Sequence, residues 1–223
     1  MATDARGRPR ENASPADFIR AHLRLAPVAG VPEIRLYAAH EETGLRRLAL
    51  PDDSGAEPPA PYWAFSWAGG LALARHVLAL PQTVRGRRVL DLGAGSGLVA
   101  IAAALAGARE VVAAETNPYG LAAIGMNAAA NGVTVMTIGD DLLPGPPPTA
   151  DLVLAGDVFY DRDLAARTLA FLGRCRATGI EVLIGDPGRA HLPRARLRVI
   201  AEYQVADVGD KAPTTPGMVL ALA

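Results

Sequence analysis

The feature of this sequence that most limits its fold is the alternation of short apolar runs with longer helical patterns between residues 88 and 184. Uninterrupted apolar runs suit strands that are covered on both faces, with helices connecting one parallel strand to the next. The pattern predicts strands over 88–92, 110–114, 133–138, 151–155 and 181–184, and helices over 98–106, 119–131 and 164–176. A helix over 69–80 precedes them, and a helix over 195–202 and strands over 203–208 and 218–223 follow. We therefore expect an α/β fold with seven strands, the last pair antiparallel.

A smaller unit precedes this domain. Ser14 and Pro15 are suited to start an amphipathic helix that ends before Pro27. Residues 33–38 and 45–50 flank a Glu-Glu-Thr-Gly turn and predict a hairpin. The expected organisation is a flexible N-terminus over 1–13, a helix and hairpin extension with a Pro-rich loop over 14–60, and the α/β domain over 61–223.

Composition excludes several classes of function. The net charge of −1 argues against a protein that binds nucleic acid electrostatically. The apolar stretch over 98–108 is far shorter than the roughly 20 residues of a membrane span. The single cysteine, Cys175, fits a reducing compartment, and the four histidines share no ligand spacing, so we expect no metal site. These observations favour a cytoplasmic monomer without membrane or nucleic-acid partners.

A glycine-rich loop follows the strand over 88–92. Gly93, Gly95 and Gly97 lead directly into an apolar helix, which lets a ligand approach the backbone at the ends of the strands. Glu115 ends the next strand about 20 residues after Gly95, where a carboxylate can accept hydrogen bonds from ribose hydroxyls. These residues favour a nucleoside-containing ligand over a purely structural turn.

Two details distinguish S-adenosylmethionine from a dinucleotide. The third glycine, Gly97, comes one residue earlier than the dinucleotide pattern requires. Asp91 places a carboxylate where it would repel a pyrophosphate but attract an ammonium group. Asp140 or Asp141, after the third strand, is placed to accept a hydrogen bond from the adenine amino group, and the sequence does not decide between them.

These motifs together resemble the class I, or seven-strand, S-adenosylmethionine-dependent methyltransferases. The resemblance covers residues 61–223 and implies the sheet order 3-2-1-4-5-7-6 of a Rossmann-like fold. It also implies that Trp67 lies over the cofactor, against the alternative of an ordinary core tryptophan. Whether Asn117 assists Glu115 in the contact with the ribose remains open, because relatives commonly carry Asp residues in this segment.

The segment Gly156-Asp157-Val158-Phe159-Tyr160-Asp161 follows the fourth strand, whose end faces the transferable methyl in this class. An ionised carboxylate accepts hydrogen bonds only, so Asp157 favours an aliphatic amine over an amide. The segment resembles the Asp/Glu-x-x-Tyr/Phe motif of seven-strand protein-lysine methyltransferases.

With Pro61-Tyr62-Trp63-Ala64, Trp67-Ala68-Gly69-Gly70 and Ile184-Gly185-Asp186-Pro187-Gly188-Arg189, the chain is similar to the family that methylates lysines of the electron transfer flavoprotein β-subunit. From this resemblance we expect Asp157 to contact both cofactor and amine. Tyr160 and Phe159 are expected to supply an aromatic wall. Asp186 and Arg189 are expected at the rim that meets substrate, against the alternative of simple turn chemistry.

Other readings remain open. The acceptor is alternatively another protein, such as a ribosomal one, or a small amine. A non-catalytic cofactor-binding or protein-binding module is the rival from another class, and a dehydrogenase is a weaker one. The mitochondrial matrix is the alternative compartment, because relatives with this resemblance occur there.

Overall fold

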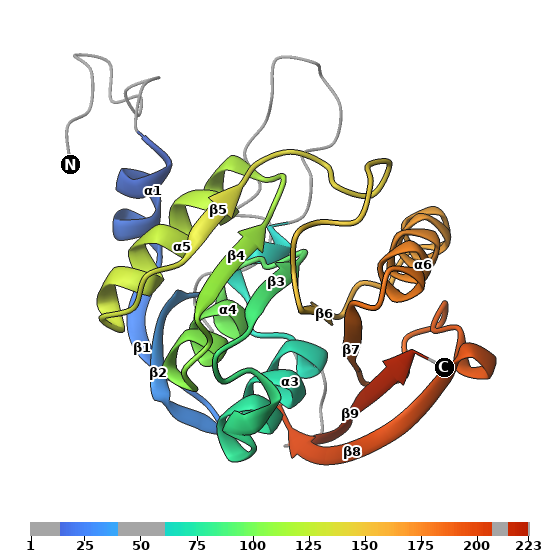
Figure 1. Ribbon diagram of the computed structural model, residues 1–223. Helices are drawn as coiled ribbons and strands as arrows, with labels where there is room; N and C mark the ends of the chain where they lie inside the picture. The colour runs from blue at the N-terminus through green and yellow to red at the C-terminus, as the bar shows by residue number, and fades with distance from the viewer. Residues whose placement is uncertain (1–13, 40–60, 207–213, 223) are drawn as a thin grey trace.

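The computed structural model describes residues 14–39, 61–206 and 214–222 and is built around a seven-stranded sheet of order β5-β4-β3-β6-β7-β9-β8 (Figure 1). Strands β3 to β7 are parallel, and β9 is antiparallel to both β7 and β8. Numbered from the strand before the glycine loop, the order is 3-2-1-4-5-7-6, which confirms the expected topology. The strands are β3 (Arg88–Leu92), β4 (Glu110–Ala114), β5 (Met136–Ile138), β6 (Leu152–Gly156), β7 (Glu181–Asp186), β8 (Leu197–Val205) and β9 (Thr215–Leu222).

Helices cover both faces of the sheet (Figure 1). Helices α3 (Ala68–Ala79), α4 (Leu98–Leu105) and α5 (Pro118–Ala130) pack on one face, and α6 (Arg162–Ala177) packs on the other. Adjacent residues of β3 enter opposite cores, Val89 with α3 and α4 and Leu90 with α6. This division follows from the pleat, which turns successive side chains to opposite faces. No helix within the described ranges is both long and apolar enough to span a membrane.

The N-terminal extension differs from the expected one. Helix α1 (Pro15–His22) has Ser14 as its N-cap and ends before Pro27, as predicted, but the chain then continues directly as β1 (Arg24–Val28), which pairs antiparallel with β2 (Val31–Ala38). The strand at residues 33–38 is therefore confirmed, with β1 as a partner, while the other expected hairpin strand, 45–50, lies outside the described residues. Pro27 is tolerated because it lies at an irregularity of an edge strand, where no ladder hydrogen bond is lost.

The end of the chain also differs. Residues 195–202 form no helix: a single 3-10 turn, η3 (Arg194–Arg196), leads into β8. An irregularity between Val199 and Ala201 lets Leu197 pack on the α6 side and Ala201 on the α3 side. Because of this irregularity, apolar and polar residues do not alternate regularly along the sequence of β8, and the strand pattern is hard to recognise. β5 (Met136–Ile138) is also shorter than the strand predicted over 133–138.

Asn127 of α5 and Asn131, the residue that follows its last turn as C-cap, join the extension to the main domain. Asn127 is fully buried; its Oδ1 accepts a hydrogen bond from the Tyr37 N–H at 2.7 Å, and its Nδ2 donates to the Ser96 carbonyl at 2.8 Å. Asn131 accepts from the Arg35 N–H and donates to the Arg35 carbonyl. The asparagine side chains thus take the place of a neighbouring strand for β2, and Asn127 also reaches the glycine loop.

We expect Asn127→Leu to lower the free energy of unfolding by about 2–4 kcal/mol, because the partly buried Tyr37 N–H and the buried Ser96 carbonyl each lose their partner. Chemical denaturation measures this change. Asn131→Ala is the control: its hydrogen bonds to Arg35 lie in an exposed region, so we expect a loss of about 1 kcal/mol or less. Equal losses in the two variants would contradict the structural role assigned to Asn127.

Candidate active site

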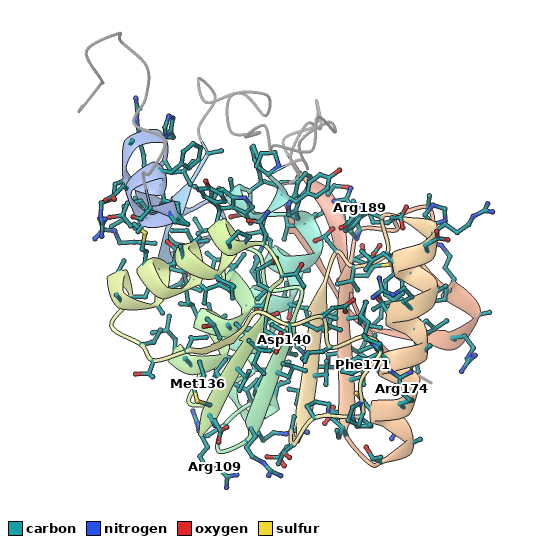
Figure 2. All side chains as sticks on the ribbon, turned by 90° about the horizontal axis from the view of Figure 1, so that it is seen from above. Arg109, Met136, Asp140, Phe171, Arg174 and Arg189 are labelled. Carbon is teal, nitrogen blue, oxygen red and sulfur yellow. The ribbon has the colours of Figure 1, made fainter. Side chains whose placement is uncertain are left out.

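A cleft of about 560 Å³ opens at the carboxyl ends of β3, β4 and β6. A smaller pocket of about 50 Å³ shares several walls with it, including Gly93 and Asp157. In Figure 2, Arg189 lies at the opposite end of the molecule from Arg109, which precedes β4, so Arg189 marks the edge where the parallel strands end. The cleft is at the position where open parallel sheets bind their ligands.

The glycine loop is shaped by left-handed backbone at all three glycines, with φ of 70°, 54° and 83° at Gly93, Gly95 and Gly97. Gly93 and Gly95 line the cleft. Gly97 does not: it precedes α4, and a Cβ there would lie 3.2 Å from Ile124 Cγ1. The structure therefore places Gly97 as a packing residue beneath the loop.

Glu115 ties the loop to the end of β4. Its two oxygens accept hydrogen bonds from the backbone N–H groups of Gly95 at 2.9 Å and Asn117 at 2.8 Å, while the side chain lines the cleft. A side chain at Gly120 would collide with Glu115, since its Cβ would lie 2.7 Å from Glu115 Cγ. Asn117 also lines the cleft, but its side-chain oxygen caps α5 by accepting from Tyr119 and Gly120.

Asp91 is nearly completely buried below the loop and lines the smaller pocket. Its Oδ2 accepts from the Ala100 N–H at 2.9 Å. Burial raises the pKa of Asp91 to about 7, and the nearby Glu115 adds to the increase. A group in this position favours a cationic neighbour, because a positive charge would compensate the buried carboxylate.

The two aspartates after β5 have different surroundings. Asp141 pairs with Arg167 and caps the turn by accepting from the Leu143 N–H. Asp140 lines the cleft and accepts no hydrogen bond from the described part of the chain. Asp140 thus keeps all of its acceptor positions for a ligand, whereas Asp141, which also lines the cleft, has one position on each oxygen occupied.

Asp157 begins the loop after β6 in a left-handed conformation, with φ of 54°. Its Oδ2 accepts from the Gly70 N–H of α3 at 2.9 Å, and its Oδ1 accepts from Arg189 Nε and Nη2 at 3.1 and 2.9 Å. Burial raises its pKa to about 6, against the opposing effect of Arg189. The carboxylate lies at the junction of the two pockets.

Aromatic side chains form the mouth of the cleft. Tyr160 is 50% exposed, and its ring lies 5.3 Å from that of Tyr62, which in turn lies 5.7 Å from that of Trp67. The Trp67 indole N–H donates to the Tyr62 carbonyl at 2.8 Å, and Arg189 lies over the Trp67 ring. Phe159 is absent from this wall, because it is fully buried in the core beside α6.

Asp186 lies in the interior and not at the rim. It is fully buried, and its Oδ1 accepts from the backbone N–H groups of Gly188 and Arg189. Its Oδ2 accepts no hydrogen bond from the described residues, and burial raises the pKa of Asp186. This turn geometry supports the alternative reading of Asp186, in which it shapes the segment that carries Arg189.

The cleft thus joins most of the residues that the sequence singled out, and adds some that it did not. Trp67, Gly93, Gly95, Glu115, Asp140, Asp157, Tyr160 and Arg189 all line it. Tyr62, Trp63, Arg167 and Thr168 also line it. The first two belong to a motif that carried the family resemblance, although sequence reasoning gave them no role. Nothing near Arg167 in the sequence points to its partner Asp141.

Solved structures share this architecture. A Thermus thermophilus protein, TrmN, has a TM-score of 0.53 and 25% identity over 73% of this chain and 52% of its own. The Pyrococcus abyssi tRNA (uracil-54, C5)-methyltransferase in complex with S-adenosyl-L-homocysteine has a TM-score of 0.52 at 19% identity, over 69% of this chain and 38% of its own. Residues 76–156 match the family profile of ribosomal protein L11 methyltransferase (PrmA). The sheet order and the glycine loop define a class I methyltransferase fold.

A narrower relationship comes from the sequence of a Xenopus laevis protein, the electron transfer flavoprotein beta subunit lysine methyltransferase, which is 37% identical over 86% of this chain and 80% of its own. The chain belongs to the family of electron transfer flavoprotein β-subunit lysine methyltransferases. The Danio rerio and Homo sapiens members are 44% and 40% identical over 67% and 66% of this chain. The matched region spans 60% of the zebrafish protein and 58% of the human one.

Proposed function

We propose that this protein transfers a methyl group from S-adenosylmethionine to lysine ε-amino groups of the electron transfer flavoprotein β-subunit. The observation that carries the proposal is the junction of a carboxylate-lined nucleoside cleft with an aromatic-acidic mouth at Asp157. The choice of the flavoprotein β-subunit as methyl acceptor is supported by membership of the family.

The residues of the cleft fit this cofactor better than a dinucleotide. Asp91, Glu115 and Asp140 are carboxylates suited to an ammonium group, two ribose hydroxyls and an adenine amino group, respectively. Both arginines of the cleft, Arg167 and Arg189, are engaged by aspartates and are not aimed at a pyrophosphate. When bound, S-adenosylmethionine supplies a methyl group on a positively charged sulfur. An amine that attacks the methyl carbon displaces this sulfur, which leaves as a neutral thioether.

The protein's own contribution is to bind and orient the amine. One acceptor position remains on Asp157 Oδ2 beside the Gly70 contact, and it suits an N–H of the ε-amino group. The exposed ring of Tyr160 provides an apolar and cation-attracting wall for the lysine side chain. Alignment of this kind contributes on the order of 7–11 kcal/mol in well-oriented reactions.

Two measurements test the proposal. Calorimetry should detect S-adenosylhomocysteine binding and no NAD binding; binding of NAD alone would assign the chain to the dehydrogenases. Incubation with labelled S-adenosylmethionine and purified flavoprotein, followed by mass spectrometry, should place the methyl group on lysine. Cofactor binding without transfer to any acceptor would favour a non-catalytic module.

We also expect cofactor binding to release a proton. Asp91 has a pKa of about 7 in the free protein, and a bound ammonium group favours its ionised form, so its pKa falls when the ligand binds. At pH 6.5 calorimetry in buffers of different ionisation enthalpy should therefore show release of ~0.5–0.8 proton, and less at pH 8. Asp91→Asn should remove this pH-dependent release, and an unchanged release would exclude Asp91 as its source.

Further features are proposed with the activity. We propose a monomer that works without a metal ion or nucleic acid, in the bacterial cytoplasm or, alternatively, the mitochondrial matrix. The buried free thiol of Cys175 is compatible with a reducing compartment. Sedimentation of the purified protein and activity in the presence of a chelator test the first two features.

A further inference from the structure

The pairing of Asp157 with Arg189 bears on how a lysine amine can react beside a carboxylate. Two N–H groups of Arg189 occupy both acceptor positions of Asp157 Oδ1, and the Gly70 N–H occupies one of the two on Oδ2. The pair is mostly shielded from water, with exposed side-chain fractions of 26% for Arg189 and 10% for Asp157. Asp157 is therefore held in place and compensated in charge before any substrate arrives.

A carboxylate without this partner would act against the reaction. Lysine in water has a pKa of about 10.4, and a neighbouring negative charge raises it further by stabilising the ammonium form. The ammonium form has no lone pair to attack a methyl group. Low polarity at the site and a nearby positive charge act in the opposite direction, and both favour the neutral amine.

We propose that Arg189 is a positioning residue that neutralises Asp157, so that Asp157 orients the lysine amine through Oδ2 without holding its proton. This inference rests on the proposed lysine methyltransferase function. The proton passes to bulk water at the open mouth of the cleft, where Tyr160 is half exposed. The guanidinium keeps its charge at any relevant pH.

The other groups around Asp157 support this arrangement. Asp186 is the second carboxylate that acts on it, and burial raises the pKa of Asp186, which favours its uncharged form. Helix α3 contributes only a backbone N–H, from Gly70. Arg189 is fixed from its other side by the Trp67 ring, 5.7 Å from the guanidinium carbon. Among these neighbours Arg189 is the positive group in contact with Asp157.

The alternative role for Arg189 is that of a plug, which occupies the lysine site and leaves when substrate binds. Expelling it would break a shielded ion pair and its contact with Trp67, and removal of one partner of a buried pair is costly. A displaced plug and a neutralising partner give opposite results on mutation, so one experiment separates them.

The experiment measures kcat against pH from 6 to 9.5 for the full-length protein, with saturating S-adenosylmethionine and a lysine acceptor that the wild type methylates. In the wild type kcat should rise with pH as the bound amine loses its proton. Arg189→Gln keeps N–H donors but removes the charge, so the rising limb should shift by about one pH unit to higher pH, with kcat at pH 7 about tenfold lower. Arg189→Lys keeps the charge, so its limb should stay within about 0.3 unit of the wild type.

Arg196→Gln is the matched control, because it removes a positive charge from the exposed turn η3 without touching the site; its profile should coincide with the wild type. Thermal unfolding and S-adenosylhomocysteine binding check that each variant is folded, and if Arg189→Gln fails that check, the position of the Arg189→Lys limb decides. The inference is overturned if the Arg189→Gln limb stays in place or moves to lower pH, or if kcat increases at every pH, as a displaced plug requires. Absence of wild-type transfer to any lysine acceptor overturns the proposed function itself.

Discussion

Replacing Asp157 with alanine is expected to lower kcat/KM for methyl transfer at least ~100-fold, equivalent to about 2.7 kcal/mol of transition-state stabilisation. The substitution removes the acceptor for the amine and leaves the shielded guanidinium of Arg189 without its partner. It also places alanine at a φ of 54°, where aspartate and asparagine are better tolerated. Initial rates with labelled S-adenosylmethionine measure the loss.

Asp157→Asn separates the charge from the backbone conformation. Asparagine tolerates the left-handed conformation, but its amide NH2 must face either Arg189 or the Gly70 N–H, and both are donors. We expect the free energy of unfolding of this variant to lie within about 2 kcal/mol of that of the wild type, and its affinity for S-adenosylhomocysteine within about threefold. The rate of methyl transfer should still fall at least ~100-fold. Near-normal transfer by Asp157→Asn would remove the carboxylate from its proposed role.

The part of the fold that sequence reasoning recovered is the part built from local signals. The strand before the glycine loop was predicted with its observed bounds, Arg88–Leu92, because its apolar run, its glycines and the following apolar helix are adjacent in the chain. The extension was predicted less well, because β2 pairs with a strand that continues directly from α1, where Leu25 also fits a helical face. The first part of β8 was wrongly predicted as a helix, since its identity as a strand depends on pairing with β9, and only its end was expected as a strand.

The candidate site shows the same division. Glycine spacing and the acidic residues after each strand indicated the cleft, since strand ends meet at one edge of a parallel sheet. The partner of Asp157 lies 32 residues away in the chain, and in the turn that begins with the positive φ of Asp157, Phe159 is buried in the core while Tyr160 lines the cleft. Neither a distant ion pair nor the direction of a strained turn is readable from residue types alone.

The close contact between α3 and β7 gives the second large effect, at Gly185. A Cβ at this position would lie 2.0 Å from the Gly69 carbonyl oxygen and 2.7 Å from Leu73 Cγ, and both atoms belong to α3. Gly185→Ala must therefore push the helix away from the sheet. We expect the free energy of unfolding to fall by about 3 kcal/mol, the upper end of the range for overpacked cores. Transfer activity should be lost as well, since α3 carries the Gly70 N–H that holds Asp157.

Gly125→Ala provides a control of opposite sign. Gly125 is an exposed residue within α5, and a Cβ there would meet nothing within 4 Å. Alanine should increase the free energy of unfolding by roughly 0.5–1 kcal/mol, because glycine inside a helix loses more backbone freedom on folding. Denaturant titration of both variants tests the packing directly: destabilisation by both would indicate a general intolerance of added methyl groups, whereas opposite signs would locate the constraint at the α3–β7 contact beneath the site.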